Sequence, residues 1–251
     1  MMTFLDLTLP TPAENLAGDE ALLDFFEENG GEGVLRFWEP QTHFVVMGYA
    51  NSVAKEVNAA ACEAGNVPIY RRCSGGGTVL QGPGCLNYSL VAPIDDSGPL
   101  YNITATNHFI MERNRTALES KFKSQKLRIE IAGHTDLVLD SRLSPAAPRL
   151  KFSGNAQRRK RRYLLFHGTF LLNFDIALIE KYLRMPSKEP AYRQGRSHEE
   201  FLANLNLRAE AVKEALRGAW GAGEAMGAVP HDAIALLARD KYVTKEWNFK
   251  F

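Results

Sequence analysis

The sequence predicts an α+β fold with a mixed, mainly antiparallel β-sheet and flanking helices. The expected elements run α-β-β-α-β-β-β-α-β-β-β-β-α-α-α, which is neither a doubly wound alternation nor a barrel. The composition, with 45% hydrophobic and 24% charged residues among 251, is that of an ordinary globular protein. No internal repeat and no low-complexity linker divides the chain, so we expect a single domain over residues 1–251.

The first half of the chain is expected to contain three helices separated by strands. Apolar residues at helical spacing predict a helix from about Pro12 to Asn29, which the Gly30–Gly31 pair ends. A short turn at Glu39–Gln41 should separate the next two strands. The other elements expected up to residue 121 are strands at 34–38 and 43–47, a helix at 52–64, strands at 67–71, 78–80 and 86–91, and a helix at 101–121.

The second half returns to strands and ends in helices. Alternating or apolar patterns predict strands at 127–131 and 136–140, followed by a proline-containing loop at 144–148. A hairpin is expected from 150–157 and 163–173. The remaining expectations are helices at 176–184, 199–220 and 232–239 and an aromatic-rich edge strand at 241–251. Residues 210–251 would form a short helical C-terminal extension, too small for a full accessory domain.

Charge and composition exclude several classes of protein. The chain has 30 Lys+Arg against 29 Asp+Glu, too balanced for a surface that grips nucleic acid throughout. No apolar run approaches the length of a membrane span, and the first ten residues do not resemble a secretion signal, so we expect a cytoplasmic protein. Three cysteines without a CxxC pair argue against a disulfide framework and structural zinc.

The stretch Arg71-Arg72-Cys73-Ser74-Gly75-Gly76-Gly77-Thr78 is the most informative segment for function. Three consecutive glycines expose backbone N–H groups and permit positive φ, so the loop can fold closely around an anion or another ligand. The two arginines supply forked donors that match phosphate or carboxylate oxygens. The stretch matches neither a P-loop nor a GxGxxG dinucleotide loop. A flexible turn with two solvated arginines is the alternative.

The stretch Lys151-Phe152-Ser153-Gly154-Asn155-Ala156-Gln157 is the second candidate. On a strand, Lys151, Ser153 and Asn155 are expected to share one face, because side chains alternate with period two. An inward-pointing lysine beside a Ser-Gly pair can hold a phosphate or neutralise charge in a transition state. An exposed lysine that protects an edge strand is the alternative.

Two smaller groups complete the candidates. His134-Thr135-Asp136-Leu137 places a carboxylate at the start of a strand, where it could meet a metal-bound phosphate, a basic side chain, or only cap a turn. Phe166-His167-Gly168-Thr169 places a histidine in an apolar strand, and Gly168 suggests the close approach of another group. The sequence contains no Ser-His-Asp order and no HExxH motif.

Together these segments resemble the lipoate–protein ligase A family of the biotin/lipoate protein ligase superfamily. The matching pieces span most of the chain and occur in the family's order. They are Arg71-Arg72-x-Ser74-Gly75-Gly76-Gly77, then Asn87-Tyr88-Ser89, Thr135-Asp136-Leu137, Lys151-Phe152-Ser153-Gly154-Asn155-Ala156 and His167-Gly168-Thr169. The fold implied by the resemblance agrees with the α+β class above.

The resemblance implies an ATP-dependent ligase. Lipoate and Mg-ATP would give lipoyl-adenylate, and the lipoyl group would pass to a lysine of an acceptor lipoyl domain. Lys151 would be the catalytic lysine, and Asp136 would help place Mg²⁺ through the phosphates. Apolar residues such as Val79 and Phe152 would suit the lipoyl tail. The implied substrate- and adenylate-binding residues are Arg71, Arg72, Ser74, Gly75, Gly76, Gly77, Thr78, Asn87, Ser153, Gly154, Asn155, Ala156, His167, Gly168 and Thr169.

The implied partner is an acceptor lipoyl domain of a 2-oxoacid dehydrogenase or a glycine-cleavage H-type protein, with no nucleic acid and no membrane. Familiar bacterial ligases carry a further accessory domain, so a separate accessory-domain protein is a possible second partner. Such acceptors are commonly acidic, and the basic run Arg158–Arg162 could be a docking patch for them. A solvated hairpin tip is the alternative.

The nearest alternative is an ATP-independent octanoyl or lipoyl transferase of the same superfamily. Such enzymes pass the acyl group through a cysteine thioester, yet no cysteine follows Cys85 here, and His134-Thr135-Asp136-Leu137 is close to the ligases' Asn-Asp-Leu pattern. Both points favour the ligase, although Cys73 lies inside the glycine loop and Cys85 near it. A biotin ligase is disfavoured because its Gly-Arg-Gly-Arg loop is replaced. A non-catalytic ligand-binding module of the same fold is the remaining alternative.

Overall fold

The chain folds around one large and one small sheet in the computed structural model, which describes residues 1–95, 97–125, 128–139 and 148–251. The strands are β1 (Thr3–Asp6), β2 (Val34–Trp38), β3 (Phe44–Met47), β4 (Ile69–Arg71), β5 (Val79–Gln81), β6 (Cys85–Pro93), β7 (Ile129–Ala132), β8 (Asp136–Leu139), β9 (Leu150–Arg159), β10 (Tyr163–Leu171) and β11 (Glu224–Ala225). The helices are α1 (Pro12–Asn29), α2 (Val53–Glu56), α3 (Ala59–Ala64), α4 (Ile103–Lys121), α5 (Ala177–Tyr182), α6 (His198–Phe201), α7 (Ala209–Trp220), α8 (His231–Leu237) and α9 (Lys245–Asn248), with a 3₁₀ turn η1 (Lys123–Gln125) and a π-helical turn η2 (Ala238–Tyr242).

The large sheet has the strand order β11-β1-β2-β6-β10-β9-β8-β7. Strand β1 pairs in parallel with β2 and β11, and the other neighbouring pairs are antiparallel. Strand β3 lies outside this sheet and is the central strand of the small sheet, between β4 and β5. The expected α+β class with a mainly antiparallel sheet is therefore confirmed.

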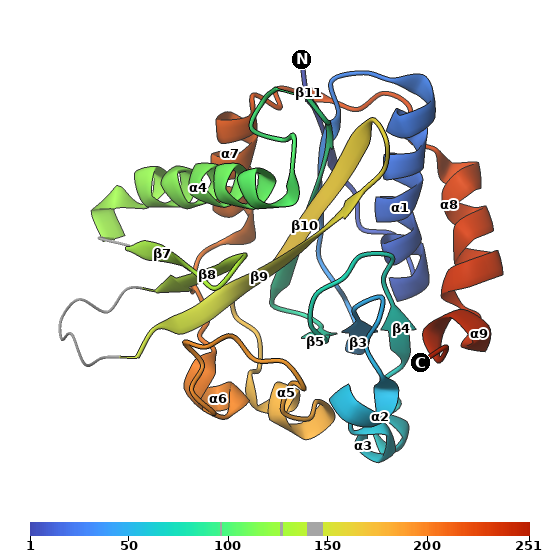
Figure 1. Ribbon diagram of the computed structural model, residues 1–251, viewed down its shortest axis with the longest axis vertical. Helices are drawn as coiled ribbons and strands as arrows, with labels where there is room; N and C mark the ends of the chain where they lie inside the picture. Colours follow the sequence, from blue (N-terminus) through green and yellow to red (C-terminus); the bar gives the residue numbers. More distant parts are fainter. Residues whose placement is uncertain (96, 126–127, 140–147) are drawn as a thin grey trace.

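Helices cover both faces of the large sheet (Figure 1). On one face α4 and α7 pack together over a core that includes Phe37, Phe166 and Phe170. On the other face α1 packs against the sheet through Leu22 and Leu23, and α8 covers its outer side. No described helix is long and apolar enough to cross a membrane.

Helix α1 forms where the sequence predicts it and is buried on almost every side. Thr11 caps it in a reciprocal capping box with Glu14, and Gly30, at φ +76°, ends it. The helix lies between the sheet and α8, so even Asn15, Asp19 and Glu20 are buried. These polar side chains need internal partners, because a buried unpaired polar group is costly.

The partner of Asp19 is Arg36 of β2. The two side chains are only 6% and 1% exposed, and Arg36 Nη1 lies 2.6 Å from Asp19 Oδ1. Arg36 also donates to the backbone oxygen of Asn15 and to its side-chain oxygen, both at 2.8 Å. Burial lowers the pKa of Arg36, and Asp19 counteracts that shift.

The single continuous helix expected at 52–64 is wrong, because two short helices occupy this range. The range divides into α2 and α3 because Val57 adopts an extended conformation and pairs with Leu183 in an isolated bridge. Asn58 then caps α3 by accepting a hydrogen bond from the Ala61 N–H. A long-range pairing therefore interrupts a helix that local sequence favours.

The expected helix at 199–220 is also wrong over its first part. Only α6 and α7 are helical, and residues 203–208 between them have no regular secondary structure. The backbone N–H of Leu205 donates to Leu171 and that of Asn206 to Leu172, so this segment hydrogen-bonds to the end of β10 and beyond. The buried side chains of Leu205 and Leu207 favour this path.

The C-terminal segment 241–251 is not an edge strand, and this expectation is wrong. It contains α9, whose first turn Thr244 caps by accepting from Trp247 N–H. Helix α9 contacts β4, which precedes the glycine loop. Parts of the expected strands at 127–131 and 136–140, and most of the loop at 144–148, lie outside the described residues.

The Asp19–Arg36 pair gives a test of the fold. Asp19→Ala leaves a buried guanidinium without its counter-charge, and we expect it to lower the free energy of unfolding by about 3–5 kcal/mol. The control is Lys121→Ala, which removes an exposed ion pair to Glu214 and should cost below about 1 kcal/mol. Urea unfolding measures both, and equal small effects would contradict a structural role for the buried pair.

Candidate active site

The glycine loop is held in shape by Arg72. Its Nε donates to Ser74 Oγ at 3.1 Å, and its Nη2 donates to the Gly77 carbonyl at 2.8 Å. Burial lowers the pKa of Arg72 to about 10. Gly76 has φ +88°, and a Cβ there would lie 2.8 Å from Arg72 Nη2 and 3.3 Å from Ala156 Cβ. The loop therefore lies directly against β9, at a spacing that needs glycine.

Arg71 is fully buried, and its guanidinium is bound within the protein. Its guanidinium donates to the carbonyls of Gly48, Tyr49, Asn51, Trp247 and Asn248. It thereby connects the glycine loop to the C-terminal segment. Its expected role in ligand binding stays a prediction.

The side chain of Ser74, in the glycine loop, is in direct contact with that of His167 in β10. Ser74 Oγ lies 2.6 Å from His167 Nε2, while His167 Nδ1 is 3.9 Å from Asp19 Oδ2. Burial lowers the pKa of His167 to about 4, so the imidazole is neutral at pH 7. Because Arg72 donates to Ser74 Oγ, the serine hydroxyl can donate to Nε2 and the ring proton is assigned to Nδ1.

Lys151 forms a second assembly with Asp136 and Tyr192. Lys151 Nζ lies 2.9 Å from Asp136 Oδ1, and the Tyr192 hydroxyl donates to Asp136 Oδ2 at 2.8 Å. The Lys151 side chain keeps 25% of its surface exposed. Both oxygens of the Asp136 carboxylate are therefore bound, and the Lys151 ammonium is held where it is partly exposed to solvent. Burial raises the pKa of Tyr192, with the Asp136 charge adding to the effect.

The expected common face holds for Ser153 and Asn155, whose side chains contact each other, but it is wrong for Lys151. A Cβ on Gly154 would lie 2.8 Å from Lys151 Nζ, whereas Asn155 points to the opposite face and accepts from the Tyr88 hydroxyl. The cause is a register shift between β8 and β9, where Leu137 pairs with Ser153 but Val138 with Lys151. One extra residue reverses the alternation of side chains. It moves the ammonium to the face that carries Ala156 and the glycine loop.

The close approach expected at Gly168 is present. A Cβ there would lie 1.8 Å from Asn155 Oδ1, so the Asn155 amide occupies that space. The Asn155 side-chain amide donates to the backbone carbonyl of Thr135, and the Asn155 backbone carbonyl accepts from the Thr135 hydroxyl. These two hydrogen bonds join β9 to the start of β8. Asn155 thus positions the strand that carries Asp136 and lies on the side away from Lys151.

Three further expected residues occupy hydrogen-bonded positions beside the loop. Asn87 and Thr169 form one hydrogen-bonded group with Gln81, in which Gln81 Nε2 donates to Thr169 Oγ1 at 2.7 Å. Thr78 accepts from Asn51 Nδ2 at 3.1 Å. Phe152 is fully buried in the core beside Phe170, so it does not provide the expected wall for an acyl tail.

Sequence analysis missed Tyr192, Gln81 and Asp19. Tyr192 lies in the irregular segment before α6, where neither periodicity nor a motif marks it. Asp19 occupies a helix position that local patterning assigns to solvent. A buried arginine in β2 is the signal that could have pointed to Asp19, because a buried cation requires a partner.

The three cysteines, Cys62, Cys73 and Cys85, are free and buried. Burial raises the pKa of the Cys73 and Cys85 thiols to about 12, and it raises that of Cys62 as well. A nucleophilic thiol needs the opposite shift.

The expected role of Asp136 in placing Mg²⁺ through the phosphates stays a prediction. Asp136 already binds Lys151 and Tyr192, and the part of the chain with assigned positions contains no group of three metal-ligating side chains. Two side chains of the basic run Arg158–Arg162 also bind other groups of the protein. Arg158 donates to the Cys73 carbonyl, and Lys160 pairs with Asp24.

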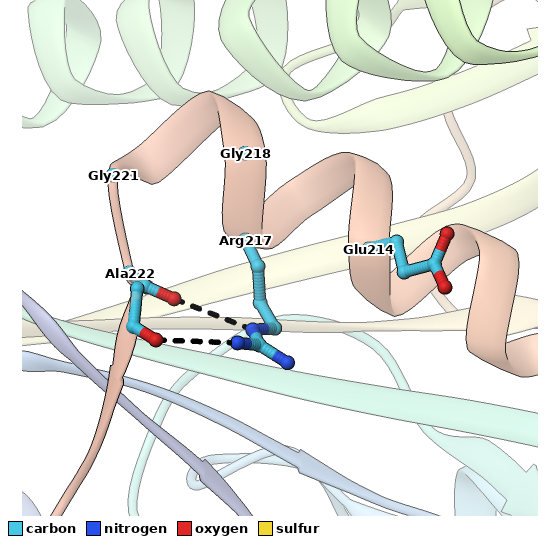
Figure 2. A pocket seen from close by; sticks show the side chains of 6 residues that line it. Glu214, Arg217, Gly218, Gly221 and Ala222 are labelled. Atoms are coloured by element: carbon cyan, nitrogen blue, oxygen red, sulfur yellow. Dashed lines mark hydrogen bonds between the residues drawn. The ribbon is translucent and has the colours of Figure 1, made fainter.

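A surface hollow of about 430 Å³ lies elsewhere, at the C-terminal end of α7 (Figure 2). Arg217 spans it and donates to the carbonyls of Ala222 and Gly223. Its lining shares no residue with the glycine loop or the Lys151 assembly, so we do not assign it to the candidate site.

Residues 11–217 match the family described as the lipoyl protein ligase A/B catalytic domain. The chain belongs to this family. Two similar proteins are octanoyltransferases LipM, one from Geobacillus kaustophilus at 29% identity over 98% of this chain and 97% of its own length. The other, from Bacillus subtilis, is 26% identical over 98% and 97%.

Solved structures confirm the lipoate-ligase fold. The bi-partite lipoate protein ligase of Thermoplasma acidophilum has a TM-score of 0.79 and 23% identity, covering 99% of this chain and 97% of that one. A second structure, a putative lipoate protein ligase from T. acidophilum with bound lipoic acid, has a TM-score of 0.80 and 22% identity over 99% of both chains.

The expected ATP-dependent ligase function is corrected by these relatives. Proteins that match 98% of the chain are named octanoyltransferases, a name for acyl transfer rather than ATP-driven ligation. The sequence argument relied on the Asp136-Leu137 pattern and on the absence of a cysteine near Lys151. Neither local feature outweighs similarity over nearly the whole length.

Thiol burial gives a test of the site. At pH 8, thiols with a pKa of about 12 are ionised to roughly one part in 10,000, against about a quarter for an unperturbed thiol. We therefore expect iodoacetamide to label Cys73 and Cys85 roughly 1,000-fold more slowly in the native protein than after unfolding in urea. Peptide mass spectrometry measures both rates, and fast native labelling at pH 8 would contradict the burial.

Proposed function

We propose that this protein is an ATP-independent acyltransferase that moves an octanoyl- or lipoyl-class acyl group onto a lysine of a lipoyl-type acceptor domain. The observation that carries the proposal is the fixed, partly exposed Lys151 ammonium on the same face of β9 as the glycine loop. The LipM relatives support the acyl class, since octanoyl transfer is in their name.

The reaction follows from where charge develops. When an amine attacks a thioester carbonyl, negative charge collects on the carbonyl oxygen. A preorganised ammonium stabilises that charge more effectively than water, because it needs no reorganisation during the reaction. Asp136 and Tyr192 fix the position of Lys151, and the glycine loop, shaped by Arg72, offers backbone donors for the acyl group's polar end.

The proposed acceptor is a lipoyl domain of a 2-oxoacid dehydrogenase or a glycine-cleavage H-type protein. The bi-partite ligase from T. acidophilum was solved as a lipoylation system with its E2 lipoyl domain, which supports an acceptor of this kind. The expected ATP and Mg²⁺ requirement is withdrawn together with the ligase function.

Removing the Lys151 charge tests the proposal. The purified protein is mixed with an octanoyl thioester of a carrier protein and a lipoyl domain, without ATP, and acyl-lysine is followed by mass spectrometry. Lys151→Ala should lower the transfer rate by about 100-fold or more, equivalent to about 3 kcal/mol of transition-state stabilisation. The control is Lys55→Ala in α2, an exposed lysine, which should keep the full rate. Product that forms only when ATP and free acid are supplied would overturn the proposal.

Tyr192→Phe tests whether Tyr192 positions the ammonium through Asp136. It removes one hydrogen bond to a charged group, so we expect kcat to fall about tenfold, equivalent to about 1.4 kcal/mol, with KM unchanged. Tyr101→Phe at an exposed tyrosine is the matched control. A lower Tm with kcat unchanged would show that Tyr192 is purely structural.

A further inference from the structure

The backbone of Arg71 is bound by side chains of α9. In the part of the chain that the structure describes, β4 is an edge strand of the small sheet, and α9 lies beside it (Figure 1). The Arg71 N–H donates to Asn248 Oδ1 at 2.8 Å, and the Arg71 carbonyl accepts from Trp247 Nε1 at 2.7 Å. These two side chains take the place of a neighbouring strand, because buried backbone groups need hydrogen-bond partners.

The Arg71 side chain extends this connection to the segment 48–51. Its Nε donates to the Trp247 carbonyl at 3.1 Å, and its Nη2 donates to the Asn248 carbonyl at 3.0 Å. Its Nη1 donates at 2.7–3.0 Å to three carbonyls of the segment, those of Gly48, Tyr49 and Asn51. One buried guanidinium therefore joins α9 to the segment 48–51.

The segment 48–51 in turn contacts the glycine loop at three points. Two of them are hydrogen bonds, from the Tyr49 N–H to the Ser74 carbonyl at 2.8 Å and from Asn51 Nδ2 to Thr78 Oγ1 at 3.1 Å. At the third point, a Cβ on Gly48 would lie 2.1 Å from the Gly76 carbonyl oxygen. Because the segment touches both ends and the middle of the loop, its position determines the conformation of the loop.

The C-terminal segment is itself anchored to α1. Lys241 Nζ lies 2.6 Å from a carboxylate oxygen of Glu20, and the Tyr242 hydroxyl donates to the same oxygen at 2.8 Å. Asn248 Nδ2 donates to the Tyr242 carbonyl at 2.8 Å, which directs the amide oxygen of Asn248 to the Arg71 N–H. The Asn248 residue is buried, and both ends of its amide are bound within the protein. The C-terminal segment is therefore a fixed support for Arg71.

From these contacts we propose that Trp247 and Asn248 are positioning residues of the acyl transfer, which act through Arg71 to hold the glycine loop in the conformation that binds the acyl donor. This proposal rests on the proposed function, in which backbone donors of the loop bind the polar end of the acyl group. A loop without this support samples several conformations, and only a fraction of the molecules is then ready to bind the donor. The apparent affinity for the donor falls in proportion to that fraction.

The proposal separates donor binding from the chemical step. The Lys151 ammonium is held by Asp136 and Tyr192, which belong to β8 and to the segment before α6. Once the donor has bound and ordered the loop, the charge that stabilises the transition state is in its usual place. Loss of the support should therefore raise the donor KM and leave kcat unchanged.

The first experiment measures steady-state constants with the octanoyl carrier thioester and a lipoyl domain, without ATP. Asn248→Ala removes both amide contacts and should raise the donor KM about tenfold, whereas Trp247→Phe removes one hydrogen bond and should raise it about threefold. For both variants, kcat and the acceptor KM should stay within about twofold of wild type. The matched control is Glu246→Ala, at an exposed position of α9, which should keep all three constants.

A purely structural role of these residues predicts a different result. A smaller folded fraction lowers Tm and the apparent kcat together, while the molecules that remain folded keep the wild-type donor KM. An unchanged donor KM in the variants, with transfer by the wild type intact, would overturn the proposal and leave the proposed function standing. If the wild type forms no acyl-lysine from the thioester donor, the proposed function fails and the proposal fails with it.

The second experiment uses only the wild-type protein and decides the question even if Asn248→Ala does not fold. Coupling between two sites is reciprocal, so a donor that orders the loop must also stabilise the C-terminal segment. Saturation with an octanoyl carrier whose thioester is replaced by an amide should slow hydrogen exchange in the glycine loop and in α9 by about threefold or more, and leave that of α7 unchanged. Protection confined to the loop, or absent from both segments, would overturn the proposal.

Discussion

The buried ion pair between Asp19 and Arg36 is the interaction on which the site face of this protein depends. Two opposite charges that are almost fully removed from water must satisfy one another, and they hold α1 against β2. Asp19 also faces His167, which hydrogen-bonds Ser74, and Ser74 accepts from Arg72. The position of the glycine loop is thus coupled, step by step, to the packing of the first helix on the sheet.

Arg71 and Arg72 hold the glycine loop in place from inside the protein. Both guanidinium groups are buried and bind backbone carbonyls, Arg72 within the loop and Arg71 between the loop and the C-terminal segment. Both bind groups within the protein, whereas the Lys151 ammonium at the candidate site stays partly exposed. In the proposed reaction the protein would therefore act by positioning and electrostatics.

Local sequence predicted much of this arrangement, and its errors have specific causes. Helix α1 and the β9–β10 hairpin follow directly from capping and alternation. The face of Lys151 was wrong because a register shift against β8 cannot be read from β9 itself. Residues 203–208 have helical patterning, yet they pair with the end of β10. Each error occurs where a partner distant in sequence overrides a local preference.

Sequence alone predicted the fold class and the family, because these depend on composition, periodicity and short patterns, and it proposed the motif residues of the candidate site. Tertiary structure decided which face carries the ammonium, that Tyr192 joins Asp136, and that the three thiols are buried. These properties depend on strand register and on packing between segments far apart in the chain. Cys73 lies inside the glycine loop in sequence, and in the folded protein α1 covers its side chain.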